Sequence, residues 1–98
     1  METPAKRVAE LMGQLSNENR LLILCALLER PMTVGELGKH VPGISAPALS
    51  QHLHKLRDAG LISCRKEAQF VRYEICDPHL HKLISLLRAE YCPGEEML

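Results

Sequence analysis

Four cysteines, at positions 25, 64, 76 and 92, are the most reactive side chains in this sequence of 98 residues. Cys25 interrupts the apolar run RLLILCALLER, where leucine or alanine would fill the same space, and Cys92 ends the stretch HLHKLISLLRAEYC. A free cysteine either packs as a small hydrophobic residue or reacts, as a thiolate, with oxidants and other sulfur species. The residue types alone leave both interpretations open.

The start of the chain, METPAKRVAE, contains no apolar stretch of signal-peptide length, and no run approaches the roughly 20 apolar residues of a membrane span. We therefore expect a cytoplasmic protein that makes no membrane contact. Because the cytoplasm keeps thiols reduced, permanent structural disulfides are not expected, whereas a transient bridge is possible.

An enzyme is not expected, and neither is a cofactor. The sequence has no Cys-x-x-Cys, no glycine-rich phosphate loop, and no Ser/His/Asp or paired-carboxylate pattern. A thiol enzyme acting through Cys25 and Cys92 therefore has no supporting motif.

Charge is balanced over the whole chain, with 12 basic and 12 acidic residues, but it is unevenly placed. Residues 39–72 hold six Lys/Arg against two Asp/Glu, whereas residues 1–38 hold four against five and residues 73–98 two against five. A basic central segment, which also contains His40, His52 and His54, suits a surface that binds phosphates. A solvated charged face is the alternative interpretation.

The elements that must position these residues are helical up to residue 60. Amphipathic spacing predicts a helix over residues 4–15, and a second helix starts after Ser16 or Asn17 and stops at Pro31. Thr33 and Glu36 have the spacing of a capping box, which predicts a short third helix. We expect one domain over residues 1–98, mainly α with a small β-hairpin, in the order α-α-α-α-β-β-α.

The fourth helix, SAPALSQHLHKLRDAG, decides the functional prediction. Leu49, Leu53 and Leu56 share one stripe of this helix, so the opposite side is free. With the short helix before it, residues 33–60 match a helix-turn-helix, in which the second helix enters the major groove of DNA. We expect base or phosphate contacts from the start and the free face of this helix: Ser45, Pro47, Ser50, Gln51, His54, Lys55 and Arg57.

Residues 61–76 contain LISCRKEAQFVRYEI, which predicts two strands around a turn near Glu67 and Ala68, with Cys64 opposite Val71. The side expected to face inward holds Ile62, Cys64, Val71, Tyr73 and Ile75. A hairpin beside a recognition helix is a wing, and its cations Arg65, Lys66 and Arg72 are expected to touch phosphate or the minor groove. A winged-helix module that binds protein in place of DNA is the alternative.

The order of these elements, the core SAPALSQHLHKLRDAGLI and the wing RKEAQFVRYEI resemble the ArsR/SmtB winged-helix repressors over residues 5–92. RLLILC, KEAQ and YCP are similar to the subgroup that contains HlyU, BigR, SqrR and YgaV. This resemblance implies a homodimer built on helices within 1–15 and 77–92, and repression of a palindromic operator. It also implies that Cys25 and Cys92 form a switch modified by an oxidant or reactive sulfur, giving a disulfide, persulfide or polysulfide. Cys64 and Cys76 are expected to be packing or incidental residues.

Metal sensing is the main alternative that the resemblance suggests, because many members of the larger family sense metals. The family's Cys-x-Cys site is missing, since the corresponding residues read GELGKH. The family's last-helix site is half present: Asp77 and His79 fit its Asp-x-His, but Glu90 and Pro93 stand at its second pair and proline cannot ligate. We expect no metal site, with Asp77 and His79 as the weak candidates. A thiol-independent regulator is the remaining alternative.

Overall fold

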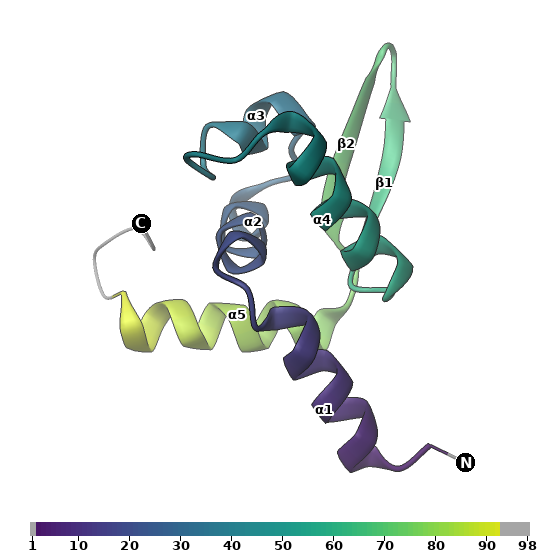
Figure 1. Cartoon of the computed structure of the whole chain (residues 1–98), viewed down its shortest axis with the longest axis vertical. Coiled ribbons are helices and arrows are strands. Elements are labelled where there is room, and N and C mark those ends of the chain that lie inside the picture. Colours follow the sequence, from purple (N-terminus) through teal and green to yellow (C-terminus); the bar gives the residue numbers. More distant parts are fainter. Residues whose placement is uncertain (1, 93–98) are drawn as a thin grey trace.

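The computed structural model describes residues 2–92 and has the element order expected from the sequence. The helices are α1 (Pro4–Leu15), α2 (Glu18–Glu29), α3 (Val34–Gly38), α4 (Ala46–Asp58) and α5 (Pro78–Tyr91). Strands β1 (Ile62–Glu67) and β2 (Phe70–Ile75) form one antiparallel hairpin between α4 and α5. This is a winged helix-turn-helix fold, in which α3 and α4 form the helix-turn-helix and the hairpin is the wing (Figure 1).

Helix α2 is the centre of the core. Six consecutive residues, 22–27, are buried, so this helix is covered on all sides. In Figure 1 it lies between the helix-turn-helix and α5, and it contacts α1, α5 and β2. Its first turn is capped by the Asn17 side chain, which accepts a hydrogen bond from the Arg20 N–H. The apolar run around Cys25 is therefore a buried helix.

Helix α4 is fixed at both ends by local chemistry. The Ser45 hydroxyl caps its start, and Gly60 has a φ of 77°, the left-handed conformation that ends many helices. The N–H groups of Gly60 and Leu61 donate to the carbonyls of Arg57 and Leu56, the pattern of a Schellman motif. Its apolar stripe, Leu49, Leu53 and Leu56, is buried as predicted. The opposite face is thereby held toward solvent.

The wing is attached to the core at its base. Met32, in the loop between α2 and α3, exchanges two backbone hydrogen bonds with Tyr73, of 3.0 and 2.7 Å. Met32 is 2% exposed, so this attachment is buried. From there the hairpin extends away from the body of the molecule (Figure 1).

The predicted hairpin register is wrong by two residues. Cys64 pairs with Tyr73, not Val71, and the turn residues are Ala68 and Gln69. The predicted face of the hairpin is correct, because a shift of two residues leaves each side chain on the same side of a strand. Val71, however, pairs with Lys66 beyond the core and is 40% exposed.

Helix α1 buries only one end of its apolar face. Leu15 is buried and Leu11 packs partly on the core, whereas Val8 and Met12 are 54% and 44% exposed. Among the described residues, no helix is long and apolar enough to cross a membrane.

Candidate nucleic-acid interface and thiol pair

The start of α4 is built by its own side chains. The Ser45 Oγ accepts a hydrogen bond from the Ala48 N–H at 3.2 Å, and Pro47 occupies the first turn, where a missing N–H costs nothing. Both residues are exposed. They therefore lie at the solvent-facing end of the helix that the helix-turn-helix pattern assigns to DNA.

The outward face of α4 carries the remaining helical residues singled out from the sequence. Gln51, His54, Lys55 and Arg57 are exposed, and Ser50 is half-buried. Gln51 and Lys55 are one helical turn apart and therefore lie on the same side of the helix. This face presents amide, hydroxyl and cationic groups, which can donate hydrogen bonds to acceptor atoms of base edges and phosphates.

Arg57 joins α4 to the wing. Its guanidinium donates to the Cys64 sulfur at 3.5 Å and to the His54 Nδ1 at 3.3 Å. The hydrogen bond and the charge interaction with Cys64 raise the pKa of Arg57, so it remains a cation. The structure thus brings Arg57, His54 and Cys64 together, an arrangement the sequence pattern did not indicate.

His52 is turned toward the core and does not share the outward face of α4. The Arg20 Nε–H donates to its Nδ1 at 3.1 Å, and Arg20 also donates to the side chain and the carbonyl of Gln14. Burial lowers the pKa of His52, and the positive charges of Arg20 and Lys55 lower it further. His52 therefore favours its neutral form and adds little charge to the basic segment.

The wing cations are not equivalent. Arg65 pairs with Glu67 and Glu74, and Arg72 pairs with Glu67 and Glu36. Lys66 is exposed and forms no ion pair within residues 2–92. Lys66 is therefore the wing cation that is free to meet a phosphate.

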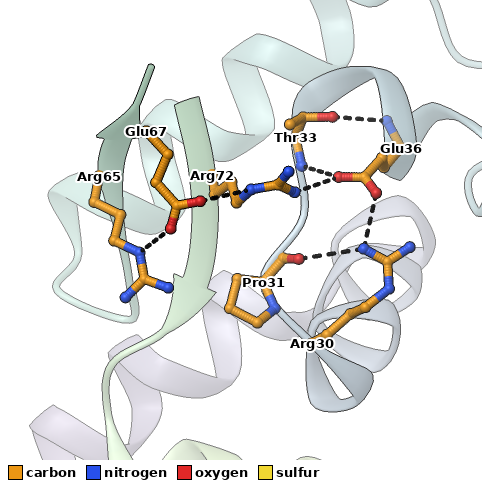
Figure 2. A network of polar contacts seen from close by, with 7 residues as sticks. All are labelled: Arg30, Pro31, Thr33, Glu36, Arg65, Glu67 and Arg72. Atoms are coloured by element: carbon orange, nitrogen blue, oxygen red, sulfur yellow. Dashed lines mark hydrogen bonds and ion pairs between the residues drawn. The ribbon is translucent and has the colours of Figure 1, made fainter. Parts of the chain in front are cut away.

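Glu36 connects the wing to the helix-turn-helix (Figure 2). It completes the predicted capping box with Thr33, and its carboxylate also accepts hydrogen bonds from Arg30 and Arg72. The Thr33 backbone hydrogen bond, followed by the Arg30 hydrogen bond and the charges of both arginines, lowers the pKa of Glu36 to about 2. Glu36 is thus ionised under all physiological conditions. The sequence indicated the cap but not the ion pairs with Arg30 and Arg72. The pair with Arg72 joins residues 36 positions apart in the chain.

Cys25 and Cys92 lie on two helices that pack against each other, α2 and α5. Cys25 is 9% exposed, and its sulfur and Glu29 both interact with the guanidinium of Arg88 on α5 and raise the pKa of Arg88, Glu29 more strongly. Cys92 is the C-cap of α5, and its N–H donates to the Arg88 carbonyl at 2.9 Å. Arg88 therefore pairs with Glu29, one helical turn after Cys25 on α2, and binds the Cys92 N–H through its carbonyl. Pro93 and Gly94, which follow Cys92 in the chain, lie outside the described residues.

Cys64 and Cys76 occupy separate places. Cys64 lies in β1 beside Arg57, and the exposed Cys76 donates from its sulfur to the Gly60 carbonyl at 3.5 Å. All four cysteines are free thiols in the structure.

Asp77 serves as a helix cap. Its Oδ1 accepts hydrogen bonds from the N–H groups of His79 and Leu80 at the start of α5. Within residues 2–92, no group of three His, Cys, Asp or Glu residues is arranged to hold a metal ion. Pro93, at the second half of the family's last-helix site, lies outside this range.

Arg20, Glu29 and Arg88 were missed by reasoning from the sequence. Each makes contacts between elements that are distant along the chain, such as the pair Arg88–Glu29, 59 residues apart. No local pattern signals such contacts. The local signal for Arg88 is its position one helical turn before Cys92.

Comparison with known proteins agrees with this geometry. Residues 17–63 match the model of the bacterial regulatory protein arsR family. The transcriptional activator HlyU of Vibrio cholerae is 41% identical, over 98% of this chain and 88% of its own length. The structure of its reduced form superimposes with a TM-score of 0.84 at 42% identity, covering 90% of this chain and 92% of HlyU.

Two further solved structures are similar. The transcriptional repressor BigR of Xylella fastidiosa has a TM-score of 0.81 at 34% identity, covering 90% of this chain and 89% of BigR. The homodimeric winged helix-turn-helix DNA-binding domain of Mb0332 from Mycobacterium bovis has a TM-score of 0.76 at 26% identity, covering 88% of this chain and 79% of that domain. The 41% identity to HlyU extends over nearly the whole chain, and the two folds are the same. This protein therefore belongs to the ArsR family of bacterial regulatory proteins and is a transcriptional regulator.

Proposed function

We propose that this regulator binds a palindromic operator as a homodimer, as a repressor, and that reversible linkage of Cys25 to Cys92 controls its affinity for DNA. The observation that carries the switch is the position of Arg88: its side chain pairs with Glu29, one helical turn after Cys25 on α2, and its carbonyl accepts a hydrogen bond from the Cys92 N–H. Both thiols are thereby associated with one residue of α5. The relative HlyU is a transcriptional activator and the relative BigR is a transcriptional repressor. We propose repression, because it requires only that the protein occupies its operator.

DNA binding is supported by the exposed face of α4 and the wing beside it. The donors of this face are Ser50, Gln51 and Lys55, and Lys66 extends the surface along the wing. Gln51 suits the edge of an adenine, and the lysines suit phosphates. We assign sequence reading to Gln51 and general affinity to Lys55 and Lys66.

A homodimer is supported by the apolar side chains that one copy leaves uncovered. Val8 and Met12 on α1, and Leu86 and Tyr91 on α5, are between 44% and 80% exposed. So small a domain gains stability by burying such surface. The similar domain of Mb0332 is homodimeric. In a dimer, two copies of α4 would read half-sites about 34–36 Å apart.

The switch requires a defined redox step. In the disulfide form, the two thiols lose two protons and two electrons to an oxidant as the S–S bond forms. With a polysulfide, S–S bonds of the polysulfide break: one or more of its sulfane sulfurs remain in the link, and a further one takes up the two electrons and the two thiol protons and leaves as hydrogen sulfide. A link ties the middle of α2 to the end of α5. Because α2 packs against β2 and α5 belongs to the proposed dimer interface, this link shifts the spacing of the two reading helices.

The experiment is a titration of duplex DNA from upstream of the protein's own gene, followed by fluorescence anisotropy at fixed salt with a chelator. We expect tight binding by reduced protein, weak binding after polysulfide treatment, and recovery with a thiol reductant. If binding is unaffected by polysulfide but changes when zinc replaces the chelator, the thiol switch is wrong and a metal-responsive regulator using Asp77 and His79 replaces it. If neither treatment has an effect, the regulator is thiol-independent.

A further inference from the structure

The polar network of Figure 2 lies between the core, the helix-turn-helix and the wing, apart from both the thiol pair and the reading face of α4. It contains three arginines and two glutamates from α2's end, α3 and both strands. Its central member is Glu36, because this one carboxylate receives hydrogen bonds from three different parts of the chain.

The two oxygens of Glu36 divide these contacts. Oε1 accepts from the Thr33 N–H at 3.0 Å and from Arg72 Nη1 at 2.8 Å, and Oε2 accepts from Arg30 Nη1 at 2.8 Å. Arg30 directly follows α2, and Arg72 lies in the middle of β2. Since α3 also packs against α4 and β2, Glu36 stands where the wing meets the helix-turn-helix.

Arg72 is engaged on its other side as well. Its Nε donates to Glu67 Oε2 at 3.0 Å, while Glu67 Oε1 accepts from Arg65 at 3.1 Å. Arg72 thus spans two carboxylates, one on α3 and one near the wing tip, and its side chain is only 30% exposed. A guanidinium can hold two carboxylates in fixed directions because its donors form a rigid planar fork, which an ammonium lacks.

We infer that Glu36 is a positioning residue for DNA binding: through Arg72 it fixes the wing at the angle to α4 that lets Lys66 reach a phosphate. Glu36 itself touches no DNA in this arrangement, and Arg72 serves the wing's orientation in place of the phosphate contact expected from the sequence. The inference rests on the DNA-binding part of the proposed function and is independent of the thiol switch.

The sign of one substitution separates this role from simple electrostatics. Removing a carboxylate from a DNA-binding protein ordinarily strengthens binding, because it removes repulsion from the phosphates. The positioning role predicts the opposite for Glu36→Gln. Glutamine keeps the capping box but loses the charge that holds both arginines. Asp58→Asn, at the exposed end of α4, removes the same charge and is the matched control.

The test measures the affinity of full-length reduced protein for a duplex of about 30 base pairs, long enough for two half-sites. We expect Glu36→Gln to weaken binding roughly three- to tenfold and to lower the salt slope by about 1 per subunit, as for a lost phosphate contact. Asp58→Asn should bind as tightly as the wild type or more tightly. Thermal unfolding of each variant establishes that it is folded.

A double-mutant cycle with Lys66→Ala tests whether Glu36 acts through the wing. If Glu36 positions Lys66, the Lys66→Ala effect shrinks in the Glu36→Gln background; additive effects would overturn the inference, as would a Glu36→Gln protein that binds as well as Asp58→Asn. If Glu36→Gln does not fold, Arg72→Lys replaces it. That variant keeps the positive charge, so full affinity contradicts positioning and a several-fold loss supports it. A wild-type protein that fails to bind any duplex would refute the proposed function, a result distinct from all of these.

Discussion

Replacing Lys66 by alanine should reduce the salt dependence of DNA binding more than replacing Arg65 does. Lys66 is exposed and has no ion pair among residues 2–92, whereas Arg65 already pairs with Glu67 at 3.1 Å and with Glu74 at 3.7 Å. A phosphate must compete with two carboxylates for Arg65 and with water alone for Lys66. The two residues are neighbours in β1, and their side chains point to opposite faces of the hairpin.

The magnitude follows from counterion release. Each phosphate contact contributes about 0.9 to the slope of log affinity against log salt concentration. Losing Lys66 should therefore lower the slope by about 1 per subunit, or about 2 for a dimer with two wings. At ~0.1 M salt the same term corresponds to roughly eightfold in affinity per contact, and it vanishes as the salt approaches ~1 M.

The assay is fluorescence anisotropy of reduced protein on a fixed duplex over a series of salt concentrations. Arg65→Ala serves as the matched variant, because it removes one positive charge from the adjacent position. We expect a clear drop in slope for Lys66→Ala and a smaller one for Arg65→Ala. Equal slopes for the wild type and Lys66→Ala, or a larger change for Arg65→Ala, would refute this assignment of the wing charges.

Three further predictions concern the scaffold. Burial and two nearby cations lower the pKa of His52 below its ordinary value of 6.5, so the unfolded chain binds a proton at this residue more readily than the folded chain does. The free energy of unfolding should therefore fall as the pH drops through about 6.5. In denaturant titrations His52→Gln should flatten this pH dependence, and an unchanged pH profile would count against the prediction. Leu53 is fully buried, so Leu53→Ala should lower the free energy of unfolding by roughly 2–5 kcal/mol in urea titrations, and a loss below about 1 kcal/mol would contradict its core position. Ala68 has a φ of 56°, a backbone conformation that costs an L-residue about 1–2 kcal/mol. Ala68→Gly should remove this strain at a smaller entropic cost and raise the unfolding midpoint slightly. A lower unfolding midpoint for Ala68→Gly would refute the strain at this residue.

The fold was predictable because its signals are local. The capping box of Thr33 and Glu36, the Ser45 cap and the leucine stripe of α4 are each contained in a few consecutive residues, and the structure has all of them. The hairpin register was not predictable. Alternation of side chains is unchanged by a shift of two residues, and the turn at Ala68 and Gln69 has no glycine or asparagine to mark it.

The candidate site divides in the same way. The outward direction of Gln51 and Lys55 follows from the helical period, so the sequence was sufficient to predict that both side chains are exposed. The contacts of Arg72 with Glu36, of Arg20 with His52 and of Arg88 with Glu29 depend on how the helices and strands pack. From the sequence, Arg72 was expected to touch phosphate or the minor groove; in the structure its guanidinium spans the carboxylates of Glu36 and Glu67.

The central claim is that a link between Cys25 and Cys92 controls DNA affinity, and the ratio of Kd after and before polysulfide treatment tests it most directly. The ratio is compared for the wild type, Cys25→Ala and Cys64→Ala, with Cys64 as the matched thiol because it lies beside an arginine but outside α2 and α5. We expect a large ratio for the wild type and Cys64→Ala, and a ratio near one for Cys25→Ala. A Cys25→Ala protein that still loses affinity on treatment and recovers with reductant would contradict the claim.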